Sequence, residues 1–166
     1  MTTEERSPDC LQARKKALQL LEYKDRTVKG LSDRLRQAGF SDEAVRDAVC
    51  YMASFGYLND ERYAENYIRF HHAGSSRKKL TAQLSRLGVD IHTVAQAWET
   101  VMLDESHDER AQLRHLMEKK YGSKPTSDPV ELRRRIGYFA RRGFEYEDIM
   151  AVLQTYTCET EENMQE

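Results

Sequence analysis

The apolar residues of the chain recur at intervals of three to five positions, which is typical of helices that bury one face. Near the N-terminus, Ser7-Pro8-Asp9 predicts the start of a helix with proline in its first turn, and the pattern continues to about Lys24. Leu11, Leu18 and Leu21 are expected to form the buried face of this helix.

A second helix is predicted from a capping residue, Thr27, and carries Leu31 and Leu35 on one side. It ends at Gly39, because glycine readily adopts the left-handed backbone conformation that terminates helices. In such an ending the next residue, Phe40, packs back against Leu35. A third helix follows, and its cap and apolar residues are Ser41, Val45, Val49 and Met52. One structural unit is therefore three helices joined by short turns.

The glycine turn at Gly39 occurs twice more, at Gly88 and Gly143, with apolar residues at matching positions on both sides. This self-similarity predicts three tandem repeats, each too small to bury much apolar surface alone, so neighbouring repeats should pack end to end. The matching residues are Leu31, Leu35, Phe40, Val45 and Val49 in the first repeat, Leu80, Leu84, Val89, Val94 and Trp98 in the second, and Phe139, Phe144, Ile149 and Leu153 in the third.

The third repeat departs from the other two in two places. Arg135 falls on the position that Leu31 has in the first repeat, and we expect the neighbouring Ile136 to take over the buried role. The spacing to its glycine is also six residues longer, and a loop rich in Gly, Pro and Ser at residues 121–127 accounts for this insertion. Asp128 then caps the next helix.

The expected organisation is a leader at residues 1–8, three-helix repeats at 9–56, 57–104 and 105–157, and an acidic tail at 158–166. The fold class is all-α, with the three tandem three-helix repeats forming an elongated array. The tail carries glutamates and no Lys or Arg, so it is expected to be disordered.

The seam between the first and second repeats is an aromatic turn, Phe55-Gly56-Tyr57-Leu58. Gly56 can end one helix, while Asn59 caps the next and Asp60 lies near its positive N-terminal end. We expect the tyrosines here, Tyr57 included, to be buried and to fix the angle between repeats rather than to stack on bases. The apolar stripe of the second helix is formed by Leu58, Tyr63, Tyr67 and Phe70.

Composition favours exposed helices over a deep core, because 39% of the residues are hydrophobic and 33% are charged. No apolar run approaches the roughly 20 residues that span a bilayer, and residues 1–9 lack the apolar core of a secretory signal. Cys10, Cys50 and Cys158 have no CxxC spacing and indicate reduced thiols. We therefore expect a cytoplasmic, monomeric protein without membrane contact.

The formal net charge is −2, so attraction of the whole molecule to nucleic acid is not expected. The basic residues are instead concentrated in two acid-free segments, residues 66–89 and 132–142. Backbone amides at a helix N-terminus beside Ser75 and Ser76 suit a phosphate. For each basic segment, the alternative to a binding site is a solvent-exposed helix face without a partner. This alternative is favoured for residues 132–142. The candidate contact residues are Arg69, Arg77, Lys78, Lys79, Arg86, Arg133 and Arg134.

No catalytic or metal site is predicted. Five histidines and three cysteines show no metal-binding spacing, and the chain contains neither a glycine-rich phosphate loop nor a nucleophile elbow. We expect no enzyme activity and no cofactor. The aromatic residues assigned to the core by their repeated positions are Phe40, Trp98, Phe139 and Phe144.

Residues 56–64, Gly-Tyr-Leu-Asn-Asp-Glu-Arg-Tyr-Ala, resemble the signature Gly-Tyr-Leu-Asp-Asp-x-Arg-Phe-Ala of the bacterial regulatory protein RecX family. Asn replaces the first Asp and Tyr replaces Phe. The Leu/Gly patterns around Gly39 and Gly88 and the motif Arg142-Gly143-Phe144 support the resemblance, which covers about residues 11–157. The signature residues to which it assigns a structural role are Gly56, Tyr57, Leu58, Asp60, Arg62 and Tyr63.

The resemblance implies a modulator of the RecA recombinase that lodges in the groove of the RecA filament on single-stranded DNA. It further implies inhibition of filament growth, strand exchange, ATP hydrolysis and coprotease activity, in homologous recombination, DNA repair and the SOS response. Two other interpretations stay open. One is a helical protein that binds single- or double-stranded DNA directly through helix-turn-helix-like units, and the other is a general helical adaptor.

Overall fold

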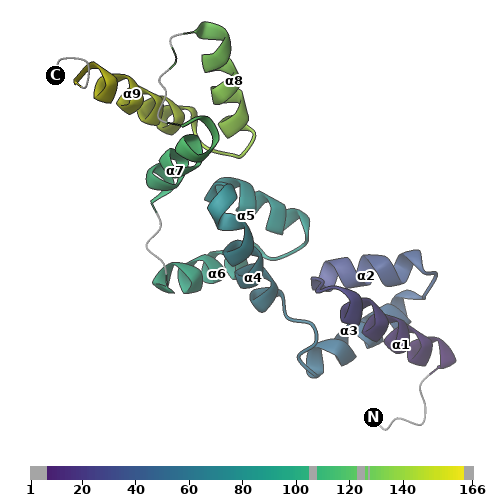
Figure 1. Ribbon diagram of the computed structural model, residues 1–166. Coiled ribbons are helices and arrows are strands. Elements are labelled where there is room, and N and C mark those ends of the chain that lie inside the picture. Colours follow the sequence, from purple (N-terminus) through teal and green to yellow (C-terminus); the bar gives the residue numbers. More distant parts are fainter. Residues whose placement is uncertain (1–6, 105–107, 123–125, 127, 163–166) are drawn as a thin grey trace. The chain divides into compact units, whose positions relative to one another are not determined.

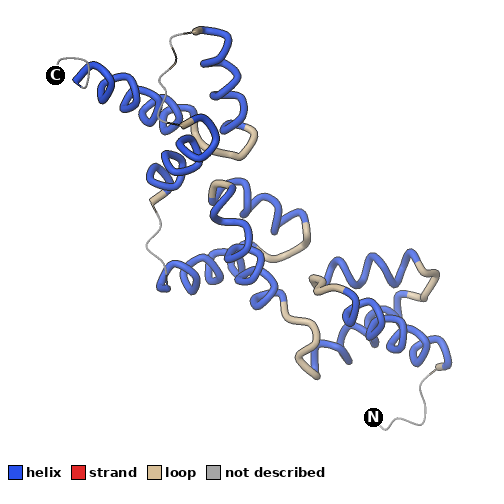
Figure 2. The backbone as a smooth tube through the Cα atoms, in the orientation of Figure 1, coloured by secondary structure: helices blue, strands red, loops and turns tan. Residues whose placement is uncertain are grey.

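The computed structural model describes residues 7–104, 108–122, 126 and 128–162 (Figure 1). Within these residues the chain forms only helices and connecting loops (Figure 2), so the all-α fold class is confirmed there. The helices follow one another as three consecutive triplets. They are α1 (Pro8–Tyr23), α2 (Val28–Gln37), α3 (Asp42–Ser54), α4 (Asp60–His71), the short 3-10 helix η2 (His72–Gly74), α5 (Arg77–Arg86), α6 (Ile91–Asp104), α7 (Glu109–Tyr121), α8 (Pro129–Ala140) and α9 (Tyr146–Glu162).

The chain divides into two compact units, and the division runs through the second triplet. The first unit comprises residues 1–68 and 83–101, and the second comprises residues 69–82 and 102–166. The first unit therefore contains the whole first triplet with most of α4 and α6 and the end of α5, and the second contains the whole third triplet with η2 and the start of α5.

The glycine that ends the middle helix of each triplet has the left-handed backbone that the sequence predicts. Gly39, Gly88 and Gly143 have φ values of 90°, 89° and 90°. In each turn the amide after the glycine donates to the carbonyl five residues earlier, at 3.1–3.3 Å, which is the hydrogen bond of a Schellman ending. The donor and acceptor pairs are Phe40 with Leu35, Val89 with Leu84, and Phe144 with Phe139.

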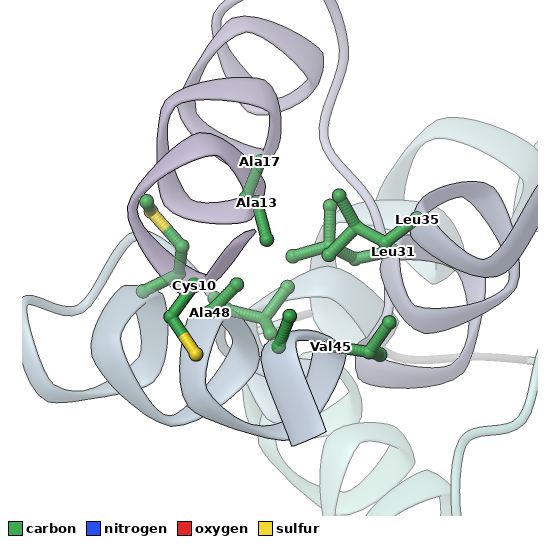
Figure 3. Packing of buried hydrophobic residues seen from close by; sticks show 10 residues of the cluster. Cys10, Ala13, Ala17, Leu31, Leu35, Val45 and Ala48 are labelled. Atoms are coloured by element: carbon green, nitrogen blue, oxygen red, sulfur yellow. The ribbon is translucent and has the colours of Figure 1, made fainter. Parts of the chain in front are cut away.

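The core of the first triplet uses smaller residues of α1 than the sequence pattern predicts (Figure 3). Cys10, Ala13 and Ala17 are buried, whereas Leu11 is 49% exposed and Leu18 37% exposed. The prediction of a leucine face is therefore wrong for these two leucines, although Leu21 packs half-buried against the core. Small side chains let α1 approach α3 closely, and α1 packs most extensively against that helix. The opposing residues come from α2 and α3 and include Leu31, Leu35, Ala44, Val45 and Ala48.

Arg135 stays in the buried position of the third triplet, contrary to the expectation that Ile136 replaces it. Its side chain is 10% exposed and its Nε donates to Glu131 Oε1 at 3.2 Å. The guanidinium carbon lies 4.5 Å from the ring centre of Tyr121, which covers its flat face. An arginine can occupy this site because its charge is paired and its stem is apolar, while Ile136 packs half-buried against the same core.

Some side chains that the sequence predicts to be buried, at the signature turn and at the repeated aromatic positions, are buried, and others are exposed. Leu58 is 5% exposed, and Trp98, Phe139 and Phe144 are also buried, as predicted from their repeated positions. Tyr57, however, is 56% exposed and Phe70 is 82% exposed, so neither belongs to the core. The buried face of α4 is formed instead by Ala64 and Ile68, which lie one turn apart, with Tyr63 and Tyr67 half-buried beside them.

Helix α9 extends further than the sequence suggests. It runs to Glu162, so the segment that begins at residue 158 continues the helix instead of leaving it. Residues 163–166 of the acidic tail lie outside the described residues.

Candidate binding surface in the second and third repeats

The first turn of α5 carries the basic run predicted to contact a partner. Arg77 and Lys78 are exposed, and Lys79 is half-buried. Ser76 caps this helix, because its Oγ accepts the Lys79 amide at 3.3 Å, and Ser76 itself is only 1% exposed. The helix N-terminus is therefore enclosed, even though its side chains point outward.

The amides at this N-terminus already have acceptors within the second unit. The Ser76 amide donates to the Arg142 carbonyl at 3.1 Å, and the Arg77 amide donates to Glu109 Oε1 at 2.6 Å. The turn that follows α8 and the first turn of α7 thus occupy the place that the sequence offers to a phosphate. The amides of Ser76 and Arg77 are therefore already satisfied by the third repeat and are not free donors for a phosphate.

The first unit contains the same arrangement, 49 residues earlier in the chain. Thr27 Oγ1 donates to the Leu87 carbonyl at 2.6 Å, and the Val28 amide donates to Asp60 Oδ1 at 2.8 Å. In both units a carboxylate of the next repeat accepts the first backbone amide of the middle helix. The residue just before that helix, Thr27 or Ser76, donates a hydrogen bond to the carbonyl that precedes the glycine of the next repeat. We call this arrangement the repeat junction. It joins the first repeat to the second and the second to the third, and it explains a structural role for Asp60.

The middle helix of the third repeat does not present an equivalent N-terminus. Helix α8 begins at Pro129, and Asp128 caps it by accepting the amides of Val130 and Glu131 at 3.1 and 3.4 Å. It starts three residues farther from its glycine than α5 does, so the position of Ser76 is taken by Glu131 inside the helix. The junction therefore occurs at two places in the described part of the chain.

Asp60 is the carboxylate of the first junction, and its surroundings shift its pKa. Burial raises the pKa of its carboxyl above the ordinary 3.8, and the hydrogen bond from the Val28 amide only partly opposes this. A raised folded-state pKa means that the ionised form is disfavoured on folding, so its contribution to stability falls as the pH rises above 3.8. Asp60→Asn keeps the Oδ1 acceptor and removes the charge.

We expect Asp60→Asn to gain stability relative to wild type as the pH is raised from 3 toward 7, measured by urea unfolding at each pH. Glu61→Gln serves as the matched control, because Glu61 is an exposed carboxylate in the same first turn of α4. A stability difference that does not change with pH would contradict the assignment.

The lysines of α5 have two different roles. Lys79 Nζ donates to the Arg141 carbonyl at 3.0 Å, so this side chain holds the glycine turn of the third repeat. Lys78 Nζ pairs with Glu145 Oε1 at 2.7 Å, and this hydrogen bond raises the pKa of Lys78. Both partners of that pair are largely exposed. A pair of this kind is worth little in water and can open to another anion.

The remaining candidate arginines lie at the surface of the two units. Arg69, Arg133 and Arg134 belong to the second unit with the α5 run, whereas Arg86 belongs to the first. All four are exposed, and Arg134 pairs with Glu131 at 3.3 Å. The structure thus brings most of the predicted basic residues into one unit.

Sequence reasoning missed a cluster of cations on tyrosine rings in the second unit. Lys120 Nζ lies 3.9 Å and Arg142 Cζ 4.6 Å from the ring centre of Tyr138. Arg142 also donates to the Gly74 carbonyl at 2.7 Å, which ties it to the repeat junction. The sequence contains one signal for this contact. Tyr138 and Arg142 are four residues apart, and side chains at this spacing lie next to each other on a helix. Because cations occupy the ring of Tyr138, it does not serve as a stacking platform for bases.

The described residues offer neither a metal site nor a membrane-spanning helix. Among them no group of three or more His, Cys, Asp and Glu residues is arranged to hold a metal ion. None of their helices is long and apolar enough to cross a membrane.

The fold and its surface define a class: helical-repeat proteins whose three-helix domains are joined in tandem. The chain belongs to the regulatory protein RecX family. Profiles described as the first, second and third three-helix domains of RecX match residues 13–52, 59–97 and 108–153. It is therefore a regulatory protein, and the three tandem domains predicted from the glycine spacing are confirmed.

Relatives and solved structures agree with this assignment. The chain is 35% identical to the regulatory protein RecX of Trichlorobacter lovleyi over 148 residues, which cover 87% of this chain and 93% of the relative. It is 33% identical to that of Amycolatopsis mediterranei, with 85% and 83% covered. The crystal structure of RecX from Lactobacillus salivarius has the same fold, with a TM-score of 0.67 and 21% identity over 90% of this chain and 97% of that one.

Proposed function

We propose that this protein binds the RecA filament on single-stranded DNA in the cytoplasm and inhibits its assembly. Reduced strand exchange, ATP hydrolysis and coprotease activity follow, because each requires the assembled filament. Membership of the regulatory protein RecX family is the observation that supports this proposal. The tandem domains suit it as well, since an array of repeats can contact several subunits of a filament at once.

The contacts are proposed to be made by the exposed basic side chains, mainly those of the second unit. These side chains can replace water and counter-ions with carboxylates of the filament or phosphates of the DNA. Lys79 takes a different part, because its ammonium already holds the turn after α8. The proposed contact residues are Arg69, Arg77, Lys78, Arg86, Arg133 and Arg134.

The direct test is RecA filament assembly and ATP hydrolysis on single-stranded DNA, with the protein titrated in as a monomer. We expect inhibition at micromolar concentrations or below. The fourfold variant with Arg77, Lys78, Arg133 and Arg134 replaced by Ala should raise the concentration for half-inhibition by about tenfold or more, since four charged contacts are lost.

The control is Lys15→Ala with Lys16→Ala, which removes two positive charges from the other unit, because both lysines are exposed on α1. It removes positive charge without touching the proposed surface and should inhibit as wild type does. No effect of the wild-type protein on RecA would contradict the proposed function. Strong binding to DNA without RecA that weakens steeply with salt would favour the alternative of a direct DNA-binding protein.

A further inference from the structure

Large apolar side chains lie exposed where the first repeat meets the signature turn. Leu18 of α1 is 37% exposed and Tyr57 is 56% exposed, although the sequence pattern assigns both to the core. Helix α1 packs through Cys10, Ala13 and Ala17 instead, which leaves its leucines outside. These residues belong to the first unit. An apolar group that a helix does not use for its own core is available to a partner.

Leu18 and Tyr57 line one surface pocket with a volume of about 310 Å³, together with Leu21, Glu22, Asp25 and Arg62. This volume is within the range that holds a bound side chain or small ligand. The pocket continues into a row of rings, because Phe55 lies 6.5 Å from Tyr57 and 4.8 Å from Tyr51, measured between ring centres. Phe55 is 62% exposed and Tyr51 is 37% exposed. The pocket and the exposed rings of Phe55 and Tyr57 form one apolar surface, which we call the seam surface. Tyr51 borders it, and the guanidinium of Arg14 lies over its ring, 3.9 Å from the ring centre.

The side chains that line the pocket include two carboxylates and one guanidinium, so their net charge is −1. Glu22 and Asp25 line the pocket, and neither forms an ion pair with another residue that the structure describes. Arg62 also lines the pocket and keeps its positive charge while it donates to the neutral Gly56 carbonyl at 3.0 Å, which leaves one carboxylate in excess. Two carboxylates would repel the phosphates of a nucleic acid, and they would attract a Lys or Arg. The charge therefore selects a protein segment with a basic residue beside its apolar ones.

We propose that the seam surface docks an amphipathic helix of a partner protein. Its apolar face would place one large side chain in the pocket and another over the exposed rings, and a Lys or Arg beside them would face Glu22 and Asp25. Recognition of this kind uses anchors one or two turns apart on a helix. The family signature residue Tyr57 then contributes to binding as well as to the turn between the first two repeats.

The test uses a labelled synthetic helix and contains no RecA, so its outcome is independent of the proposed function. The probe is an 18-residue amphipathic peptide with Leu on one face and Lys beside it, of a length that allows a stable helix of about five turns. A second peptide carries Glu in place of each Lys. Fluorescence anisotropy with the full chain should show micromolar binding of the Lys peptide and much weaker binding of the Glu peptide. Amide NMR shifts should change mainly in residues 18–25 and 51–62.

Variants of the seam surface identify the contacts. Leu18→Ser and Tyr57→Ser should each weaken binding of the Lys peptide about tenfold, as truncation of a central apolar contact does. Glu22→Gln with Asp25→Asn should weaken it about threefold and reduce its salt dependence. Val130→Ser is the matched control, because Val130 is 64% exposed on α8 in the other unit, and it should bind as wild type. Absence of binding, equal binding of both peptides, or unchanged binding by the variants would overturn the proposal.

Discussion

Gly143→Ala is expected to destabilise the protein by about 3 kcal/mol or more, through two effects that add. The first is backbone strain, because the residue has a φ of +90°, which an L-residue with a side chain rarely adopts. The second is steric. A Cβ atom at Gly143 would lie 2.5 Å from Ser76 Oγ and 2.6 Å from Lys79 Cβ, across the junction of the second and third repeats. Gly88→Ala should behave alike, since its Cβ would lie 2.4 Å from Lys29 Cβ.

The chain supplies a matched control at Gly39. It has the same φ of +90°, yet no atom lies within 4 Å of the position a Cβ would take. Gly39→Ala should therefore show only the strain, about 1–2 kcal/mol. Thermal melting followed by circular dichroism would measure all three variants, and a difference of 2 kcal/mol corresponds to about 4–8 °C in a protein of this size. Equal losses at Gly39 and Gly143 would show that the junction is looser than the structure describes.

The glycines also show why the sequence predicts the repeats well. A turn with φ near +90° strongly favours glycine, so it leaves a mark at the same place in each repeat. Leucines four and eight residues before such a glycine face the core, as Leu31, Leu35, Leu80 and Leu84 all do. The organisation into triplets of helices follows from these constraints on the backbone and on one helix face.

The packing of α1 could not be predicted in the same way. Periodicity assigns the most apolar residues to the buried face, which selected Leu11 and Leu18. The first helix instead buries the small residues Cys10, Ala13 and Ala17 and packs more extensively against α3 than against α2. Distance between two helices is a tertiary property, and a single helical stretch carries little information about it.

The candidate binding surface was predicted in part. The basic segments were visible as acid-free stretches, and most of their charges are exposed as expected. The repeat junction was not visible, because a backbone carbonyl accepts a hydrogen bond whatever its side chain is. Leu87 and Arg142 offer the same carbonyl to the preceding repeat although their side chains have nothing in common. The sequence signal for the junction is a hydroxyl residue followed by a carboxylate at the same distance along the chain in both repeats. Thr27 and Asp60 form the first pair, and Ser76 and Glu109 form the second.

Asp47→Ala is expected to destabilise the first repeat by about 3 kcal/mol, because it leaves a buried guanidinium without its main counter-charge. Arg14 Nε and one terminal nitrogen donate to the two carboxylate oxygens of Asp47 at 2.6 and 2.8 Å. The two side chains are only 10% and 21% exposed, and the guanidinium carbon lies 3.9 Å from the ring centre of Tyr51. The pair links α1 to α3.

The control for Asp47 is Asp33→Ala, which breaks the exposed pair of Asp33 with Lys29 on α2 and should leave the melting temperature almost unchanged. A double variant, Arg14→Met with Asp47→Leu, separates the two sides of the interaction. It removes both charges and keeps the volume, so it should recover to within about 1 kcal/mol of wild type. If it is as unstable as Asp47→Ala, the pair itself stabilises the fold. If it recovers, the large loss comes from the stranded arginine, and the pair serves mainly to fix how α1 lies on α3.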